Sequence, residues 1–387
     1  MKIISNTVGL STIIAKVSKA CSRNKNGLPI LQYLLFKKEG NDYSIIASSE
    51  DLWVQHRIEF TSVEGEWHNF CLPMGSATTA IGMLPDQPIT IEVADEAENG
   101  SYSIKFTTSG ENGKVTTFDS VALSSTEYPV RDLDRNTAKI TVPTKSLLTC
   151  MKEAAKYVAI DPLRPVMMGT YLLFENDQFT VVGTDGHRLY RNHIKCDVEG
   201  LEEGKQASVD VPTGVEPILS SCAADAEVIR VGISDKQVSF VTQNAVVIST
   251  VYEGRYPNYN SVIPKNSKVA VFNKRELVTA TRLVRNFAPT DTDILCMSFG
   301  SSMFMELSTT DLDFASSARD SVIIVDSDKI GNLRIGMKGS SLLTCLSDIQ
   351  TENVKMKFDD SMHAITIHED SEESELLILL MPMQLND

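Results

Sequence analysis

The sequence predicts an α+β protein of three similar domains, in which amphipathic helices cover extensive antiparallel sheet. The chain has 387 residues, more than one hydrophobic core usually serves. A strand-then-helix segment occurs three times at nearly equal spacing, and a second, strand-helix-strand segment also occurs three times. Short alternating apolar and polar stretches bounded by Gly, Asn and Asp lie between these helices, and they are typical of antiparallel strands.

The first repeated segment is a short β-like stretch that continues into an amphipathic helix. Its copies are KIISNTVGLSTIIAKVSKACS from Lys2, KITVPTKSLLTCMKEAAKYVA from Lys139 and KVAVFNKRELVTATRLVRNFA from Lys268. Apolar residues recur at helical spacing, so one face of each helix is expected in the core. The predicted core residues are Ile13, Ile14 and Val17 in the first copy, Leu147, Leu148, Met151, Ala155 and Val158 in the second, and Leu277, Val278, Leu283, Val284 and Phe287 in the third.

The second repeated segment has a strand, a glycine, a short helix, a polar turn and another strand. Its copies start at Cys71, Asp210 and Ile335, with the glycine at Gly75, Gly214 and Gly339. We therefore predict three domains, at residues 1–133, 134–264 and 265–387, each built from two similar βαβββ-like halves. The alternative is chance similarity, because amphipathic helices are common.

Basic residues are concentrated in the helices of the first repeated segment, although the formal net charge of the chain is −15. A uniformly acidic surface repels nucleic acid, whereas a basic helix face attracts phosphates. If the repeats are related by rotation, the three faces form one surface suited to a DNA duplex of any sequence. The alternative is that each face is merely solvated. The basic residues are Lys16, Lys19, Arg23 and Lys25, then Lys145, Lys152 and Lys156, then Lys274, Arg275, Arg282 and Arg285.

The remaining composition predicts a cytoplasmic protein without a cofactor or a metal. No stretch is long and apolar enough to span a bilayer, and the amino terminus has no readable secretory signal. The seven cysteines are scattered and never form C-x-x-C, so we expect reduced, mostly buried thiols. The six histidines show no metal-ligand spacing.

The stretch TVVGTDGHRLYRN, residues 180–192, raises the question of catalysis, because Asp185 and His187 are residue types found in active sites. No supporting motif accompanies them: the chain has no G-x-S-x-G, no H-E-x-x-H and no phosphate-binding loop. Asp-Gly between two alternating runs predicts a hairpin turn instead. A hydrolase centred on Asp185 and His187 is therefore the weakest of three hypotheses, and we expect no enzyme activity.

Four phrases, in this order and spacing along the whole chain, resemble the bacterial DNA polymerase III beta subunit, the sliding clamp. They are LPILQYLLF (28–36), GTDGHRLY (183–190), YEGRYPNYNSVIPK (252–265) and LLMPMQL (379–385). The resemblance implies a DNA-clamp fold and a ring-shaped homodimer, with helices lining a pore and sheets outside. Such a ring encircles duplex DNA as a processivity factor. Its partners are DNA polymerase III subunits, the clamp loader and repair polymerases, which dock through linear peptide motifs.

The resemblance also assigns residues. Lys25 and Arg164 match positions where clamps meet DNA. Separately, because only the outer domains have free flanks, we expect the first domain of one subunit to join the third of the other, with the end of the helix near Phe287 contributing. The full predicted DNA-binding set is Lys16, Lys19, Arg23, Lys25, Lys145, Lys152, Lys156, Arg164, Arg282 and Arg285. A peptide pocket between the second and third domains is implied at Met167, Thr184, Gly186, His187, Arg188, Leu189, Pro257, Val262, Leu379, Met381, Pro382 and Met383.

Some positions depart from the family pattern. Clamps often carry a basic residue where this chain has Ser261, and commonly an arginine where it has Gln384, so the pocket rim is expected to be less positive than usual. Asn386 and Asp387 extend beyond the usual terminus, and the carboxylate there is expected to shift peptide preference. The second hypothesis for the whole chain is a scaffold that binds peptides but not DNA, with its basic helices in subunit contacts.

Overall fold

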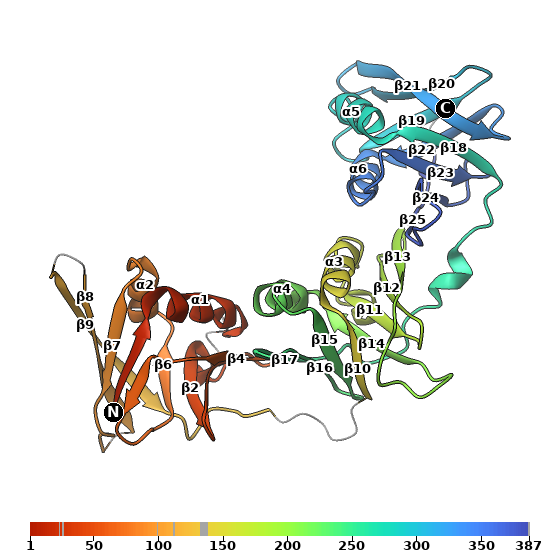
Figure 1. The fold of residues 1–387 in the computed structure, drawn as a ribbon. Coiled ribbons are helices and arrows are strands. Elements are labelled where there is room, and N and C mark those ends of the chain that lie inside the picture. Colours follow the sequence, from red (N-terminus) through yellow and green to blue (C-terminus); the bar gives the residue numbers. More distant parts are fainter. Residues whose placement is uncertain (23, 25–26, 99, 111–112, 132–137, 386–387) are drawn as a thin grey trace. The chain divides into compact units, whose positions relative to one another are not determined.

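The computed structural model of the chain describes residues 1–22, 24, 27–98, 100–110, 113–131 and 138–385 (Figure 1). Two compact units are present. Unit 1 contains residues 1–148 and 198–251, and unit 2 contains residues 149–197 and 252–387. The predicted domain boundary at residues 133 and 134 lies outside the described residues, and the division into three domains stays a prediction.

The first repeated segment folds as predicted in all three copies, as a strand followed directly by a helix. In two copies an asparagine ends the strand and caps the helix: Asn6 Oδ1 accepts from the amides of Val8 and Gly9, and Asn273 Oδ1 accepts from the amide of Glu276. Such a side chain satisfies amides that have no partner inside the helix. The pairs are β1 (Lys2–Asn6) with α1 (Thr7–Val17), β10 (Ala138–Pro143) with α3 (Thr144–Ala154), and β18 (Lys268–Asn273) with α5 (Lys274–Arg285).

The second repeated segment also has the predicted strand, helix and strand in each copy. The elements are β6 (Phe70–Pro73), α2 (Ser76–Met83) and β7 (Pro88–Val93); β14 (Ala207–Pro212), α4 (Glu216–Ala223) and β15 (Val228–Ile233); and β22 (Leu333–Lys338), α6 (Gly339–Ser347) and β23 (Asn353–Phe358). Six short helices and extensive antiparallel sheet confirm the α+β class for the described part of the chain.

Unit 1 contains one 13-stranded sheet in the order β10-β15-β16-β17-β4-β3-β2-β6-β9-β8-β7-β1-β5. Strand β17 pairs with β4, with Ala245 opposite His56, so one sheet continues between residues of the predicted first and second domains. Helix α1 packs against both α2 and α4. The other strands are β2 (Tyr33–Glu39), β3 (Asp42–Ser48), β4 (Leu52–Ile58), β5 (Ser62–Glu64), β8 (Ser101–Ser109), β9 (Val115–Ser124), β16 (Gln237–Val241) and β17 (Ala245–Thr250).

Unit 2 has the strand order β11-β12-β13-β25-β24-β23-β18-β21-β20-β19-β22. Strand β13 pairs with β25, with Leu189 opposite Leu379, so residues of the predicted second and third domains share a sheet here too. Helix α5 packs against α6 (Figure 1). The strands not yet given are β11 (Gly169–Phe174), β12 (Gln178–Thr184), β13 (Arg188–Lys195), β19 (Ile294–Phe299), β20 (Phe304–Asp311), β21 (Ser316–Asp328), β24 (Ile365–Glu369) and β25 (Leu377–Leu380).

The predicted apolar face of the third basic helix was partly wrong. The buried residues of α5 are Leu277, Ala280, Thr281 and Val284, which follow the three- and four-residue spacing of one helix face. Leu283 and Phe287 lie off that stripe and are 47% and 44% exposed. These two apolar side chains are therefore available at the surface of unit 2.

The helix predicted in the second copy of the first repeated segment was also too long. Helix α3 ends at Ala154, so Ala155 and Val158 lie in the turn that follows and are half-buried. The seven cysteines are free, and five of them are buried, as predicted. Within the ranges that the structure describes, no helix has the length and apolar character needed to cross a membrane.

Candidate functional site

The Asp185-Gly186-His187 stretch forms the hairpin turn between β12 and β13, as predicted. Asp185 Oδ1 accepts hydrogen bonds from the amides of His187 and Arg188 at 2.8 and 2.7 Å. Oδ2 accepts from Arg188 Nε at 2.9 Å and lies 2.8 Å from one of its terminal nitrogens. Gly186 has φ of 87°, a conformation that residues with a Cβ rarely adopt. The carboxylate of Asp185 is thus occupied in shaping the turn.

Arg188 connects this turn to a buried group behind it. Its guanidinium lies over the ring of Tyr157, 5.5 Å from the centroid, and Tyr157 donates a hydrogen bond to the buried carboxylate of Asp348 at 2.7 Å. Burial raises the pKa of Tyr157, so the phenol stays protonated as the donor. Lys156 forms an ion pair with the same carboxylate.

An apolar pocket of about 420 Å³ lies beside the turn, entirely within unit 2. Its floor belongs to a buried cluster that includes Val182, Leu189 and Leu379, and Tyr171 stacks on Tyr256 next to it with ring centroids 4.4 Å apart. The pocket walls carry three flexible, polarisable methionines, a feature of surfaces that accept several partners. These are Met167, Met362 and Met381.

Nine predicted pocket residues line this cavity. They are Met167, Thr184, Gly186, Arg188, Leu189, Pro257, Val262, Leu379 and Met381. Three other predicted residues do not line the cavity: Pro382, Met383 and His187. Pro382 and Met383 follow Met381 along the chain. His187 is exposed, and its carbonyl accepts a hydrogen bond from the amide of Met381 at 2.9 Å. That bond fixes the turn against the C-terminal segment.

Sequence reasoning missed other residues that line the pocket. Asn258, Tyr259 and Pro264 all lie within the phrase YEGRYPNYNSVIPK, so that phrase was an available signal. Met362, His363 and Ala364 form a separate wall before β24, and no motif pointed to them. His363 Nδ1 lies 2.8 Å from Asp360 Oδ2, and three hydrogen bonds from Met362 and His363 lower the pKa of Asp360 to about 2.

The predicted DNA-binding residues of unit 1 differ in their surroundings. Lys19 and Lys145 are exposed. Lys16 is half-buried, with its ammonium 3.9 Å from Asp225 Oδ2 at the end of α4. Arg23 and Lys25 lie outside the described residues.

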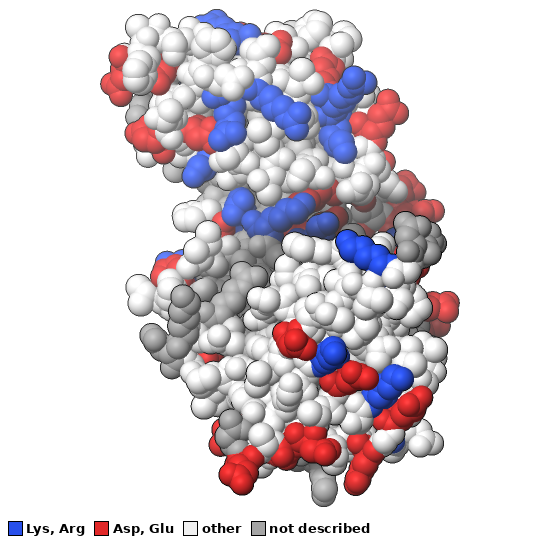
Figure 2. Space-filling model, turned by 90° about the vertical axis from the view of Figure 1, so that its left-hand side faces the viewer, with Lys and Arg blue, Asp and Glu red and all other residues white. Residues whose placement is uncertain are grey.

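In unit 2, Lys152, Arg164 and Arg282 are exposed, and within the described ranges none of them forms an ion pair. Arg285 Nε donates to Asp293 Oδ1 at 2.7 Å, and Lys156 is paired with Asp348. Figure 2 shows Lys and Arg side chains gathered in the upper part of the view, which holds α5, while Asp and Glu of that part lie mainly at its margins. The clustering of positive charge over the α5 region is therefore visible despite the acidic net charge.

Comparison with known proteins finds similarity to one kind of protein. Residues 154–258 match the sequence family described as DNA polymerase III beta subunit, central domain. A beta sliding clamp of Synechocystis is 22% identical over 91% of this chain and 93% of its own length. The DNA polymerase III beta subunit of Thermotoga maritima, with 21% identity and full coverage of both chains, has a TM-score of 0.85.

A sliding clamp from Pseudomonas aeruginosa, solved bound to griselimycin, has a TM-score of 0.88 at 20% identity, again over the whole of both chains. The resemblance seen in the four sequence phrases is thus confirmed by the comparisons with whole chains. This chain is thus similar to the bacterial DNA polymerase III beta subunits along its whole length, and it has their fold.

Proposed function

We propose that this chain is a DNA sliding clamp, a processivity factor that encircles duplex DNA and makes or breaks no bond itself. The observation that carries the proposal is the fold of the beta subunits over the whole chain. The three predicted domains and the basic helix faces support it. A clamp of this kind acts on the chromosome, in the cytoplasm.

The benefit of a clamp is a high effective concentration of its partner. A polymerase bound to a ring that cannot leave the duplex rebinds the primer end intramolecularly after each dissociation. The contact with DNA then has to be weak and independent of sequence, which lysines and arginines spread over helix faces supply through phosphate contacts. Lys19, Lys145, Lys152, Arg164 and Arg282 are the exposed residues placed to do so.

Ring closure through two subunits is supported by unpaired strand edges. In the described part of the chain, residues 115–122 of β9 pair only with β8, and residues 316–323 of β21 pair only with β20. Exposed apolar side chains accompany both edges: Val115 and Val121 on β9, Phe304 and Ile323 beside β21. We propose that β9 of one subunit joins β21 of the other, a head-to-tail contact that closes on itself.

The apolar pocket is the proposed docking site for linear peptides of replication and repair partners. A concave apolar surface with a few polar groups at its rim is the usual form of such sites. In this proposal Asp185 and His187 shape the pocket and perform no chemistry.

Two measurements test the function. Light scattering should give a particle near twice 42.6 kDa, and the protein, once loaded, should stay on nicked circular DNA but leave after the circle is cut. A stable monomer that is never retained on circles contradicts the clamp. A peptide-binding scaffold predicts a dimer with no retention at all, and a hydrolase predicts turnover that His187→Ala abolishes.

A further inference from the structure

The two strand edges that the proposed ring brings together are equally long. In the described part of the chain, β9 pairs only with β8 over residues 115–122, and beyond this range β6 takes its other side. Strand β21 pairs only with β20 over residues 316–323, and beyond this range β18 takes its other side. Antiparallel pairing uses both ranges completely in one register, in which Val115 lies opposite Ile323. Any shift from this register shortens the contact.

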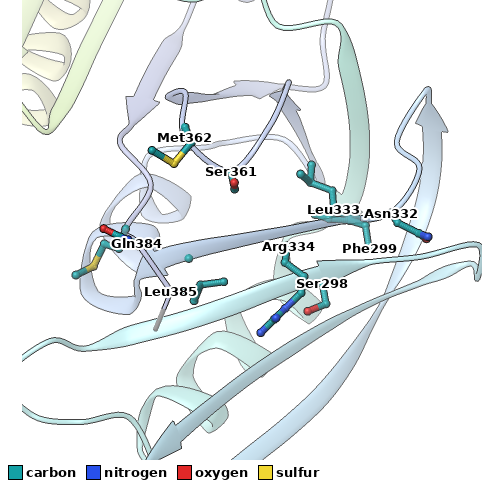
Figure 3. A pocket seen from close by; sticks show the side chains of 11 residues that line it. Ser298, Phe299, Asn332, Leu333, Arg334, Ser361, Met362, Gln384 and Leu385 are labelled. Carbon is teal, nitrogen blue, oxygen red and sulfur yellow. The ribbon is translucent and has the colours of Figure 1, made fainter. Parts of the chain in front are cut away.

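Another edge of the unit 2 sheet, at β22, is covered by the chain itself. The amide of Met383 donates to the carbonyl of Gly336 in β22 at 2.8 Å, and a Cβ at Gly336 would lie 2.3 Å from the carbonyl oxygen of Met383. Met383, Gln384 and Leu385 line a cavity of about 640 Å³ beside this strand (Figure 3). Among the described residues no such segment pairs with residues 316–323 of β21, so that edge can accept another strand.

The backbone groups of both edges point in the direction that this register needs. The amide of Ser124 donates to the β8 side at 2.9 Å, so the even-numbered residues of β9 bond β8 and the odd-numbered residues point to the open edge. The amide of Ile324 donates to the β20 side at 2.9 Å, which leaves the odd-numbered residues of β21 pointing outward too. Odd residues therefore meet odd residues. The amide of Ile323 is already bound by Glu276 Oε1 at 3.2 Å, so the new ladder ends there with one hydrogen bond.

The same register places complementary side chains opposite each other. Alternate residues of both strands are exposed, and the register puts these exposed faces on the same side of the joined sheet. Asp119 then lies opposite Arg319 in the middle of the contact, and the apolar Val115 lies opposite Ile323 at its end. All four side chains are exposed. A shift of two residues in either direction puts a serine opposite Asp119 instead.

The pair of Asp119 with Arg319 continues an alternation of charge that each subunit begins. Within the subunit, Asp119 lies opposite Lys105 of β8. Arg319 lies 3.9 Å from Glu306 of β20, in an exposed ion pair. Each edge residue thus already has a neighbour of opposite charge, and a second subunit supplies another. The signs then alternate across β8, β9, β21 and β20, an arrangement that cross-strand pairs favour.

We propose that β9 pairs with β21 of a second copy of the chain in this register, with Asp119 of one subunit bound to Arg319 of the other at the centre of each contact. A second copy is the occupant that offers both the matching edge and the matching charge. The inference rests on the proposed ring, and it adds the register of the contact and the residues by which one copy recognises another.

Charge reversal tests the pairing, by sedimentation velocity over a range of protein concentrations. Asp119→Arg or Arg319→Asp puts like charges opposite each other in both contacts of a homodimer, and each is expected to raise the dissociation constant of the dimer about 30-fold. A mixture of the two variant chains should regain the original affinity, because every contact in a ring with one chain of each kind again joins opposite charges. A fluorescent label on one variant makes the mixed particle visible.

Matched controls separate the possible outcomes. Asp42→Arg and Arg57→Asp make the same charge changes at an exposed ion pair of β3 and β4, away from both edges, and each should leave the dimer unchanged. The loss in the two edge variants should shrink at high salt. Dimers that neither edge variant weakens, or a mixture no tighter than its separate parts, overturn the pairing of Asp119 with Arg319. An unaltered chain that is monomeric overturns the ring itself.

Discussion

The hydroxyl of Tyr157 donates a 2.7 Å hydrogen bond to Oδ2 of Asp348, and both side chains are at most 1% exposed. This bond joins the turn after α3 to the end of α6, residues far apart in the sequence. Lys156 binds the other oxygen of the same carboxylate. One buried acidic group therefore holds together two segments of unit 2, immediately behind the arginine that shapes the pocket.

Loss of this carboxylate should destabilise the protein more than loss of the phenol. Tyr157→Phe removes one hydrogen bond and is expected to lower the free energy of unfolding by about 1 kcal/mol. Asp348→Ala leaves a buried phenol and an ammonium without their acceptor, with an expected loss of about 3 kcal/mol. Urea unfolding followed by circular dichroism measures both. Glu202→Gln, which breaks the exposed pair with Lys205, should change stability by less than about 0.5 kcal/mol.

The basic residues of unit 2 should not contribute equally to DNA binding. Lys152→Gln and Arg282→Gln together should weaken binding to duplex DNA of any sequence and make the binding less dependent on salt. The reason is that a protein with fewer phosphate contacts releases fewer counterions from the DNA when it binds. Lys156→Gln should have a smaller effect on DNA and a larger one on stability, since its ammonium is paired with Asp348. Filter binding between about 50 and 200 mM salt measures the slope. A Lys195→Gln and Lys329→Gln variant, equal in charge change and at two exposed residues, should keep the original slope.

Replacing the turn glycine, Gly186, should strain the backbone of the turn and so disturb the pocket. A Cβ at Gly186 meets only ordinary contacts, with Arg164 and Met167 at 3.6 and 3.7 Å, but φ of 87° disfavours any side chain. Gly186→Ala is expected to cost about 1 kcal/mol and to reduce peptide affinity without affecting retention on DNA. Gly9→Ala, within α1 and in open space, should instead stabilise the chain by about 0.5 kcal/mol. Equal behaviour of the two variants would contradict the strain argument.

The exposed apolar residues at the end of α5 should matter for subunit association. Leu283→Lys combined with Phe287→Ser is expected to shift the particle from dimer toward monomer while leaving the fold intact, because both side chains are already at the surface. Sedimentation velocity at several protein concentrations detects the shift. Val228→Lys, which changes a 52% exposed apolar side chain on β15, away from both β9 and β21, should leave association unaltered. If the variant remains a tight dimer, Leu283 and Phe287 do not contribute to the interface.

His368 should make stability depend on pH. Burial first, and then the positive charges of Lys357, Arg191 and Lys355, lower its pKa to about 4 from an ordinary value of 6.5. Between these two pH values His368 is protonated in the unfolded chain but neutral in the folded chain. The free energy of unfolding therefore falls as pH drops from about 6.5 to about 4. His368→Gln should reduce this fall. Unfolding midpoints at pH 7, 5.5 and 4.5 measure it, and an unchanged profile would contradict the shift.

The sequence determined the α+β class, the six helices with their flanking strands, and the hairpin at Asp185, because apolar periodicity and turn residues act locally along the chain. It also placed nine pocket residues, through phrases shared with a known family. It did not identify Met362 and His363, whose place at the pocket follows from the pairing of β25 with both β13 and β24.

Only the tertiary structure decided which basic residues are neutralised. Lys156 and Lys152 look alike in the sequence, four residues apart, yet among the described residues Lys156 pairs with a carboxylate 192 positions away and Lys152 pairs with none. It also decided that Leu283 and Phe287 stay at the surface and that Met362 lines the apolar pocket. Ion pairing, exposure and cavity lining depend on contacts between distant segments, which periodicity within one segment does not contain.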